Sequence, residues 1–235
     1  MYLDIVEYSE DNIDYLIQLE KHIGYGALFI AIRDPSLVDR VWELNRRHKD
    51  VPLLPLLITN SHKDFSSLIG RTILCSEVED KAGFLRAIRA PYISLVRVKL
   101  ENIAKIVTPR TIHVARQYYK FIDMPLKDFI FAQPADRVRI LIQLRKVTKL
   151  LSQKNIRTIV SSHANTIYEA ISPRQIRAIL MEIGFRDEAI KCILKENPLQ
   201  LFISPLEVTV IRHDMFLETI SRIHNMIKKT SGDKQ

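Results

Sequence analysis

The chain has 235 residues, of which 47% are hydrophobic and 26% charged, a composition typical of a folded globular protein with a sizeable core. The net charge of +8 favours a polyanionic partner. No apolar run approaches the roughly 18 residues that span a membrane, and the acidic start lacks the pattern of a signal peptide. Two cysteines, Cys75 and Cys192, exclude a disulfide framework and a cysteine zinc site, and we expect a cytoplasmic protein.

Short apolar runs alternate with amphipathic stretches along the chain. We predict strands at Leu3–Glu7, Ala27–Ile32, Leu53–Thr59, Thr72–Ser76, Ile93–Val98, Tyr119–Met124 and Ile156–Ser161, with a weaker eighth at Leu199–Ile203. We predict helices at Asp11–His22, Pro35–Arg47, Lys81–Ile88, Pro109–Gln117, Arg137–Gln153, Pro173–Ile183, Glu188–Lys195 and Leu206–Lys229. This alternation predicts parallel βαβ units, and seven or eight of them favour a compact TIM-like (β/α) barrel over a doubly wound sheet.

No linker composition interrupts the chain, so we expect one α/β barrel domain over residues 1–235. It ends in a helix at about 206–229 and a frayed tail at 230–235. The helix at Pro173–Ile183 is the best signalled, because Ser172 and Gln175 form a capping-box pattern and Gly184 ends it. In the helix at Arg137–Gln153, an apolar stripe is expected to be buried: Ile140, Leu144, Val147 and Leu151.

Positive charge gathers in the later part of the chain. Residues 1–60 hold ten acidic and six basic side chains, a net of −4, so the remaining residues carry +12 to reach +8. Seven basic and no acidic residues lie between Arg137 and Arg157, and nine basic and two acidic between Arg86 and Lys127. Phosphates would neutralise such a face and release counterions, which predicts salt-sensitive binding of nucleic acid. A solvated helix face is the alternative interpretation.

An enzyme of the metal-dependent phosphoesterase type would need clustered His and Asp at strand ends. Asp4 and Asp123 lie in predicted strands, and His62 and His163 follow strands, but no HxH or HExxH pattern is present. These four residues would form the site of a stand-alone phosphoesterase or nuclease, which we keep as the alternative hypothesis. Phosphate-loop and dinucleotide-binding glycine patterns are absent.

Ser162 and His163 follow the last well-predicted strand and raise the question of a nucleophile and its base. Adjacent residues on a strand point to opposite faces, so the two side chains are not expected to bond to each other. No G-x-S-x-G elbow surrounds the serine. We therefore interpret the pair as a tight strand-to-loop turn.

Three segments carry a resemblance to a known family. RVRILIQLRKVTKLLSQKNIRTIVSSHANTIYEAISPRQIRAILMEIGF at 137–185 resembles a basic helix, a strand ending in Ser-Ser-Gly-Ala and a Ser-Pro-Arg helix start. FIDMPLKDFI at 121–130 resembles the sixth strand and its basic loop, and ENPLQLF at 196–202 the segment that closes the barrel. In order and spacing, the chain resembles the archaeal ribonuclease P protein component 3 family, the thirty-kilodalton subunit shared with eukaryotes.

This resemblance implies a barrel akin to metal-dependent phosphoesterases but without their metal ligands. It implies no catalytic or metal-binding residue in this chain and no cofactor bound by it. In the family, the RNA subunit uses magnesium to remove the 5′ leader of precursor tRNA. The protein pairs with component 2 and stabilises the catalytic RNA, so its association with precursor tRNA is indirect. No membrane partner is implied.

The resemblance also implies a set of RNA-binding residues. Carried over by position, they are Lys127, Arg137, Arg139, Arg145 and Arg174, with Lys149 and Arg177 on the same two helices and Arg86, Arg89 and Arg97 matched less surely. Two positions depart from the family: His163 stands where glycine is usual, and Ile171 where arginine is common. A purely structural scaffold whose basic charge is incidental is the third hypothesis.

Overall fold

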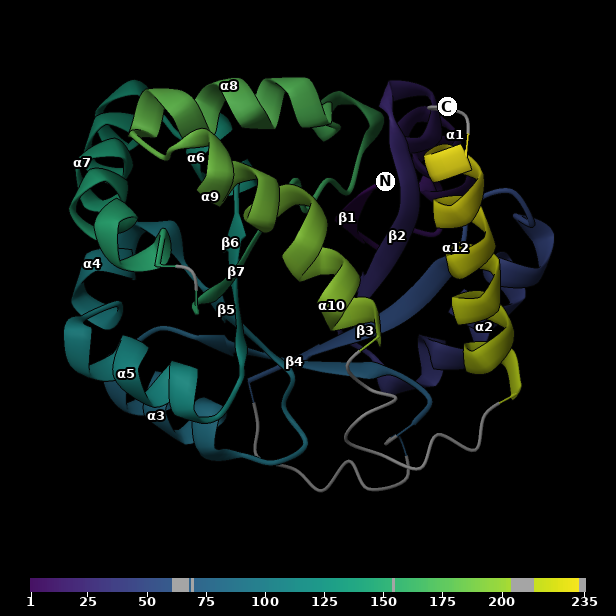
Figure 1. Cartoon of the computed structure of the whole chain (residues 1–235), viewed down its shortest axis with the longest axis horizontal. Coiled ribbons are helices and arrows are strands. Elements are labelled where there is room, and N and C mark those ends of the chain that lie inside the picture. The colour runs from purple at the N-terminus through teal and green to yellow at the C-terminus, as the bar shows by residue number, and fades with distance from the viewer. Residues whose placement is uncertain (61–67, 69, 154, 204–213, 233–235) are drawn as a thin grey trace.

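The computed structural model of the chain describes residues 1–60, 68, 70–153, 155–203 and 214–232. Within them, seven parallel strands form one sheet in which each strand pairs with the next along the sequence (Figure 1). The strands are β1 (Tyr2–Glu7), β2 (Tyr25–Ile32), β3 (Leu53–Thr59), β4 (Ile73–Val78), β5 (Leu95–Val98), β6 (Phe121–Pro125) and β7 (Arg157–Ser161). Sequential parallel strands joined by helices form an α/β TIM-like barrel, which confirms the predicted fold class.

Helices connect the strands and cover the outside of the sheet (Figure 1). They are α1 (Ile13–Ile23), α2 (Val38–Arg47), α3 (Lys81–Arg89), α4 (Ile103–Ile106), α5 (Pro109–Gln117), α6 (Lys127–Ile130), α7 (Pro134–Leu151), α8 (Pro173–Ile183), α9 (Asp187–Lys191), α10 (Asn197–Ile203) and α12 (Asp214–Gly232). None of them, within the residues described, is long and apolar enough to cross a bilayer. Neither cysteine forms a disulfide; Cys75 is buried and Cys192 half-buried.

The local signals for α8 are confirmed in detail. Ser172 and Gln175 form the predicted capping box. The Ser172 hydroxyl accepts a hydrogen bond from the backbone N–H of Gln175, and Gln175 Oε1 accepts one from the backbone N–H of Ser172. Gly184 ends the helix with a left-handed φ of 109°. The apolar stripe predicted for α7 is buried as well. These helices therefore form where their own sequences specify them.

The predicted eighth strand at Leu199–Ile203 is wrong, because these residues belong to α10, which continues a π-helical turn at Cys192–Glu196. Alternating apolar residues suggested a strand, but Leu201 and Phe202 are neighbours and both fully buried, as on one helix face. The Phe202 ring packs against Phe29 of β2, with 5.6 Å between ring centroids. A helix, and not a strand, therefore completes the core at this point.

Two kinds of contact close the barrel between β7 and β1. The segment after β7 bonds to β1 through its backbone, with His163 N donating to Ile5 O at 2.9 Å. Helix α10 packs on both strands, and Asn197 Nδ2 donates to Thr158 O of β7 at 2.6 Å. Backbone groups at the unpaired edge of β7 are thereby satisfied without another strand.

The carboxyl-terminal helix, α12, extends further than predicted. Residues 204–213, where we expected its first turns, and 233–235 of the expected frayed tail lie outside the described residues. Residues 230–232, also expected to fray, continue α12. The helix is attached to α2, since Arg222 donates to His48 O at 3.0 Å and Lys49 O at 2.7 Å. These contacts satisfy carbonyls beyond the end of α2.

Candidate functional site

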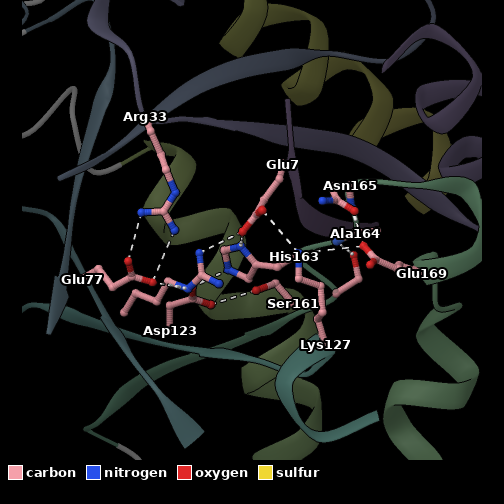
Figure 2. A network of polar contacts seen from close by, with 12 residues as sticks. Glu7, Arg33, Glu77, Asp123, Lys127, Ser161, His163, Ala164, Asn165 and Glu169 are labelled. Atoms are coloured by element: carbon pink, nitrogen blue, oxygen red, sulfur yellow. Dashed lines mark hydrogen bonds and ion pairs between the residues drawn. The ribbon is translucent and has the colours of Figure 1, made fainter. Parts of the chain in front are cut away.

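Charged side chains meet at the carboxyl end of the barrel, where enzymes of this fold carry their active sites. Strand register brings three of them side by side: Glu77 of β4 pairs with Arg97 of β5, and Arg97 pairs with Asp123 of β6. Glu7, the last residue of β1, reaches Arg97 from another strand. Figure 2 shows Glu7, Glu77 and Asp123 pointing into the same region. Because paired residues on neighbouring strands point to the same face of the sheet, these side chains occupy one shared space.

Arg97 is the centre of this cluster. The residue is 4% exposed, with Nη1 3.1 Å from Glu7 Oε1 and Nε 3.4 Å from Glu77 Oε1. Arg33 supports Glu77 from the rim, with Nη1 3.0 Å from Oε2. Burial acts to raise the pKa of Glu7 and Glu77, but the surrounding cations outweigh it and both pKa values are lowered. The surrounding cations thus keep both carboxylates ionised.

Asp123 and His163 form a second contact in the same space. Neither is exposed, and His163 Nε2 lies 2.6 Å from Asp123 Oδ2, while Ser161 Oγ donates to Asp123 Oδ1 at 2.8 Å. His163 Nδ1 lies 3.8 Å from Glu7 Oε1, so the imidazole stands between two carboxylates (Figure 2). Burial acts to raise the pKa of Asp123, but His163 and Arg97 lower it overall.

Ser162 and His163 follow β7 in a segment without regular secondary structure that bonds to β1 through its backbone, so the predicted tight turn is not formed at these two residues; their side chains have different partners. His163 has a left-handed φ of 52°, a conformation that favours glycine, which is the residue the resemblance led us to expect there. The Ser162 hydroxyl accepts from Ala164 N at 3.1 Å, so it is bound within its own loop. The imidazole bond to Asp123 accompanies this unfavourable backbone conformation, and the pair is not a nucleophile with its base.

Lys127 extends the cluster toward the rim of the barrel. Its Nζ lies 3.3 Å from Glu7 Oε2 and 3.8 Å from Glu169 Oε2, and the side chain is only 21% exposed. Glu169 in turn accepts from Asn165 N at 2.9 Å (Figure 2). Lys127 therefore closes the loop after β7 over the strand ends, and most of its charge is committed to two carboxylates.

The metal centre of a phosphoesterase does not fit this arrangement. Glu7 and Glu77 share the guanidinium of Arg97, whose positive charge would repel a divalent cation at the same place. In the described part of the chain, no group of three or more His, Cys, Asp or Glu side chains is arranged to hold a metal ion. His62, one of the four residues of the enzyme hypothesis, lies outside the described residues.

Asp4, the other predicted strand carboxylate, has different surroundings from Asp123. One of its oxygens accepts from Ser162 N at 2.8 Å, and the other has no hydrogen-bond partner. Burial raises the pKa of Asp4 to about 6, although bonds from Ser162 act to lower it. Glu20 of α1 is fully buried with both carboxylate oxygens unpartnered, and burial together with Asp4 raises its pKa to about 10. Asp4 therefore lies beside a protonated Glu20, between β1 and α1, and shares no hydrogen-bond partner with Asp123.

Most of the predicted RNA-binding residues lie on neighbouring outer helices. Those that are exposed are Arg86 and Arg89 of α3, Arg137, Arg139, Arg145 and Lys149 of α7, and Arg174 and Arg177 of α8. Helices α8 and α7 are in contact, α7 contacts α4, and α4 contacts α3, so the three helices that carry these eight residues lie on one side of the barrel (Figure 1). We call these eight residues the basic flank.

Two predicted residues are placed differently. Arg97 is buried within the barrel and paired with Glu7 and Glu77, so its assignment as an RNA contact is corrected. Lys127 is half-buried and paired as described above. Ile171 stands where the resemblance led us to expect arginine. Its side chain is 5% exposed and packs in the core, and its carbonyl accepts a hydrogen bond from Tyr25 Oη at 2.9 Å.

The basic flank differs in how far its charges are already neutralised. Arg139, Arg145 and Arg177 each pair with a carboxylate at 3.0–3.2 Å, on Asp136, Glu182 and Asp187 respectively. Arg137 donates to the carbonyls of Ile130 and Ala132. Among the residues that the structure describes, Arg86, Arg89, Lys149 and Arg174 have no ion pair. Exposed ion pairs are weak and exchange readily for phosphate, so the whole flank remains positively charged toward a polyanion.

Sequence reasoning missed the buried cluster because it counted Arg97 with the surface charge. A signal was present: Glu7, Glu77 and Arg97 each stand at or next to the end of an apolar strand run. In a barrel, a charge at that position faces the carboxyl-end mouth. Opposite signs on successive strands would have indicated ion pairing there.

Comparison with known proteins shows the fold alone. No protein-family model matches the sequence, and no curated protein shows significant similarity to it. A chain of a cryo-EM structure of archaeal ribonuclease P with mature tRNA has a similar structure, with a TM-score of 0.71 and 16% identity over 90% of this chain and 94% of that one. A probable 2-pyrone-4,6-dicarboxylic acid hydrolase from Acinetobacter baumannii, with citric acid bound, has a TM-score of 0.51 and 10% identity over 85% of this chain and 98% of that one.

Replacing Arg97 with methionine is expected to destabilise the fold strongly. The methionine fills much of the same space but leaves Glu7 and Glu77 without their shared cation, and breaking a buried ion pair costs about 3–5 kcal/mol. Urea unfolding measures the loss. The matched control is Arg86→Met, an exposed arginine whose replacement should change stability by less than about 0.5 kcal/mol. An Arg97→Met protein as stable as wild type would show that the cluster is not held by this guanidinium.

Replacing Glu20 with glutamine is expected to flatten the pH dependence of stability. The pKa of Glu20 rises from 4.5 to about 10 on folding, so its contribution is complete below about pH 4.5 and is lost as pH rises toward 10. Glutamine keeps the shape without the proton. Thermal unfolding should show a larger stabilisation by Glu20→Gln near pH 9 than near pH 5, whereas the exposed Glu10→Gln control should show no such difference. Equal effects at both pH values would contradict a protonated Glu20.

Proposed function

We propose that this chain is a non-catalytic, RNA-binding protein subunit of ribonuclease P, the ribonucleoprotein that removes the 5′ leader of precursor tRNA. The observation that carries the proposal is the likeness to a chain of archaeal ribonuclease P, which extends over 90% of this chain and 94% of that one at a TM-score of 0.71. The resemblance of segments 121–130, 137–185 and 196–202 to the component 3 family supports the same assignment from the sequence.

The basic flank supports RNA as the ligand. Its eight residues, seven arginines and one lysine, are exposed on α3, α7 and α8 along one side of the barrel. Residues 1–60, in contrast, carry a net negative charge. Charge separated in this way directs a polyanion to one side of a protein. Arginine also suits phosphate through its paired donors, and seven of the eight residues are arginine.

The ion-paired cluster at the carboxyl end of the barrel supports a subunit that does not itself catalyse cleavage. Arg97 and Lys127 neutralise the carboxylates that a barrel hydrolase would use for metal or for proton transfer. The cleavage step is then carried by the RNA subunit with its magnesium ions. In this proposal the chain contributes binding energy to the folded RNA, together with component 2 as a protein partner.

A stand-alone phosphoesterase or nuclease is the second candidate, favoured by the fold likeness to a hydrolase at a TM-score of 0.51. Its proposed residues are not gathered: Asp4 bonds to Ser162, whereas Asp123 and His163 bond to each other. Hydrolysis of RNA by the purified chain that stops on addition of a chelator would favour this candidate over the first.

Neutralising part of the basic flank is expected to weaken RNA binding without unfolding the protein. We choose Arg139→Gln, Arg145→Gln and Lys149→Gln together, because all three residues are exposed on α7. Arg145 donates to one backbone carbonyl, that of Glu182 at 3.3 Å, whereas Arg137 donates to two and is left unchanged. Binding to a ribonuclease P RNA transcript is measured at several salt concentrations. The slope of affinity against salt should fall by about one for each residue that contacts a phosphate.

The matched control is Arg40→Gln, Arg46→Gln and Arg47→Gln together. These three arginines belong to α2, which lies on the other side of the barrel (Figure 1). All three are exposed, so the change in net charge is the same. The control variant should keep the wild-type salt slope. Equal loss of affinity in both variants would mean that RNA responds to net charge alone, and an unchanged affinity of the α7 variant would remove the flank as the RNA-binding face.

A further inference from the structure

A cavity of about 630 Å³ lies at the opposite end of the barrel from the ion-paired mouth. It opens between the end of α5, the start of β7 and the helical run that leads into α10. Its lining residues are Arg116, Gln117, Tyr119, Asn155, Arg157, Cys192, Glu196, Asn197 and Gln200. This lining contains one aromatic ring, two guanidinium groups and four carboxamides, and no aliphatic side chain. We refer to it as the α5–β7 pocket.

Arg157 is held in place in this pocket by aromatic rings. Its guanidinium carbon lies 5.4 Å from the centroid of the Tyr119 ring and 5.2 Å from that of Phe121, and Nη1 donates to Tyr119 O at 3.4 Å. Within the described residues it has no carboxylate partner. Its charge is therefore oriented but not neutralised, which is the state that suits binding of an anion.

Tyr119 presents its ring to solvent at the edge of the pocket. The residue is 70% exposed, and its backbone has a left-handed φ of 54°, which is rare for a bulky side chain. Tyr118, its neighbour, is also exposed but does not line the pocket. The backbone of Tyr119 thus turns an aromatic ring outward beside a fixed cation.

Most of the remaining lining groups are uncharged hydrogen-bond donors and acceptors. Asn155 and Gln200 have no hydrogen-bond partner among the described residues. Glu196 is the acidic member of the lining, and it is met by Lys191, whose Nζ lies 3.4 Å from Oε1, and by the Cys192 thiol, which donates to Oε2 at 3.2 Å. The pocket therefore remains positively charged, with two carboxamides, those of Asn155 and Gln200, available to a ligand beside one exposed ring.

We propose that the α5–β7 pocket binds one unpaired nucleotide of RNA, with the base stacked on Tyr119 and the phosphate at Arg157 and Arg116. This inference rests on the proposed RNA-binding function and adds a second, chemically different site to the basic flank. Unpaired RNA bases are recognised by stacking on aromatic rings and by hydrogen bonds from amides to the base edges. A protein partner is disfavoured, because the energetic centres of protein interfaces are apolar pockets and this lining has no aliphatic residue.

The test uses the full chain and a short single-stranded RNA that carries one 2-aminopurine. Stacking of this fluorescent base on tyrosine quenches its emission. We expect wild-type protein to bind and quench at low salt, and Tyr119→Ala to weaken binding about tenfold and abolish the quenching. Tyr119→Phe keeps the ring and should behave as wild type. Tyr118→Ala is the matched control, since it removes the adjacent exposed ring outside the pocket and should also behave as wild type.

The outcomes separate this inference from the proposed function. A Tyr119→Ala protein that binds the RNA and quenches 2-aminopurine like wild type would overturn the nucleotide site. The same conclusion would follow if Tyr118→Ala lost as much affinity and quenching as Tyr119→Ala. If the α7 variant loses affinity for the ribonuclease P RNA while wild-type protein never quenches 2-aminopurine, the proposed function stands and the pocket assignment falls. If Tyr119→Ala leaves oligonucleotide binding intact but weakens association with component 2, the pocket is a protein site and the RNA assignment is wrong.

Discussion

The guanidinium of Arg97 lies between Glu7 and Glu77, and without it these two strand ends would carry largely buried carboxylates that have lost their shared cation. Burying charged groups is costly unless each has a partner of opposite charge. Loss of one member of the cluster would therefore destabilise the others. Asp123 depends on it too, because Arg97 and His163 together hold its pKa low against burial. The barrel therefore holds its carboxyl end together by charge pairing, at the end where enzymes of this fold carry their active sites. In the proposed function, the outer surface and not this end binds the RNA.

The outer surface offers two kinds of chemistry at separate places. The basic flank presents exposed, flexible cations on neighbouring helices, which suits the regular phosphate backbone of a folded RNA. The α5–β7 pocket instead presents a fixed guanidinium, an exposed ring and carboxamides, which suits a base that has left its stack. A subunit with both would hold an RNA by charge and fix its register at one nucleotide. The division is physical, because long exposed side chains adapt to many phosphates while Arg157 is oriented by Phe121 and Tyr119.

The sequence predicts what depends on neighbouring residues and misses what depends on distant ones. Ser172, Gln175 and Gly184 specify α8 through local hydrogen bonds, and the structure follows them. The segment at 199–203 was misassigned, because alternating leucines imitate a strand, while the contact of Phe202 with Phe29, far away in the chain, decides for a helix. Arg97 was counted with the surface charge for the same reason: its partners, Glu7 and Glu77, come from other strands. The seven-strand barrel was predictable because its repeated strand and helix signals agree with one another, whereas the buried cluster exists only once the strands are in register.

The most direct test of the account is reconstitution of precursor-tRNA cleavage. Release of the 5′ leader is followed with the catalytic RNA alone, with component 2, and with this chain added, each at the same magnesium concentration. The account predicts that the chain accelerates leader release only when the RNA is present, and that the chain alone leaves precursor tRNA intact. Leader release by the chain without RNA would contradict it, because the ion-paired mouth would then have to open into an active site.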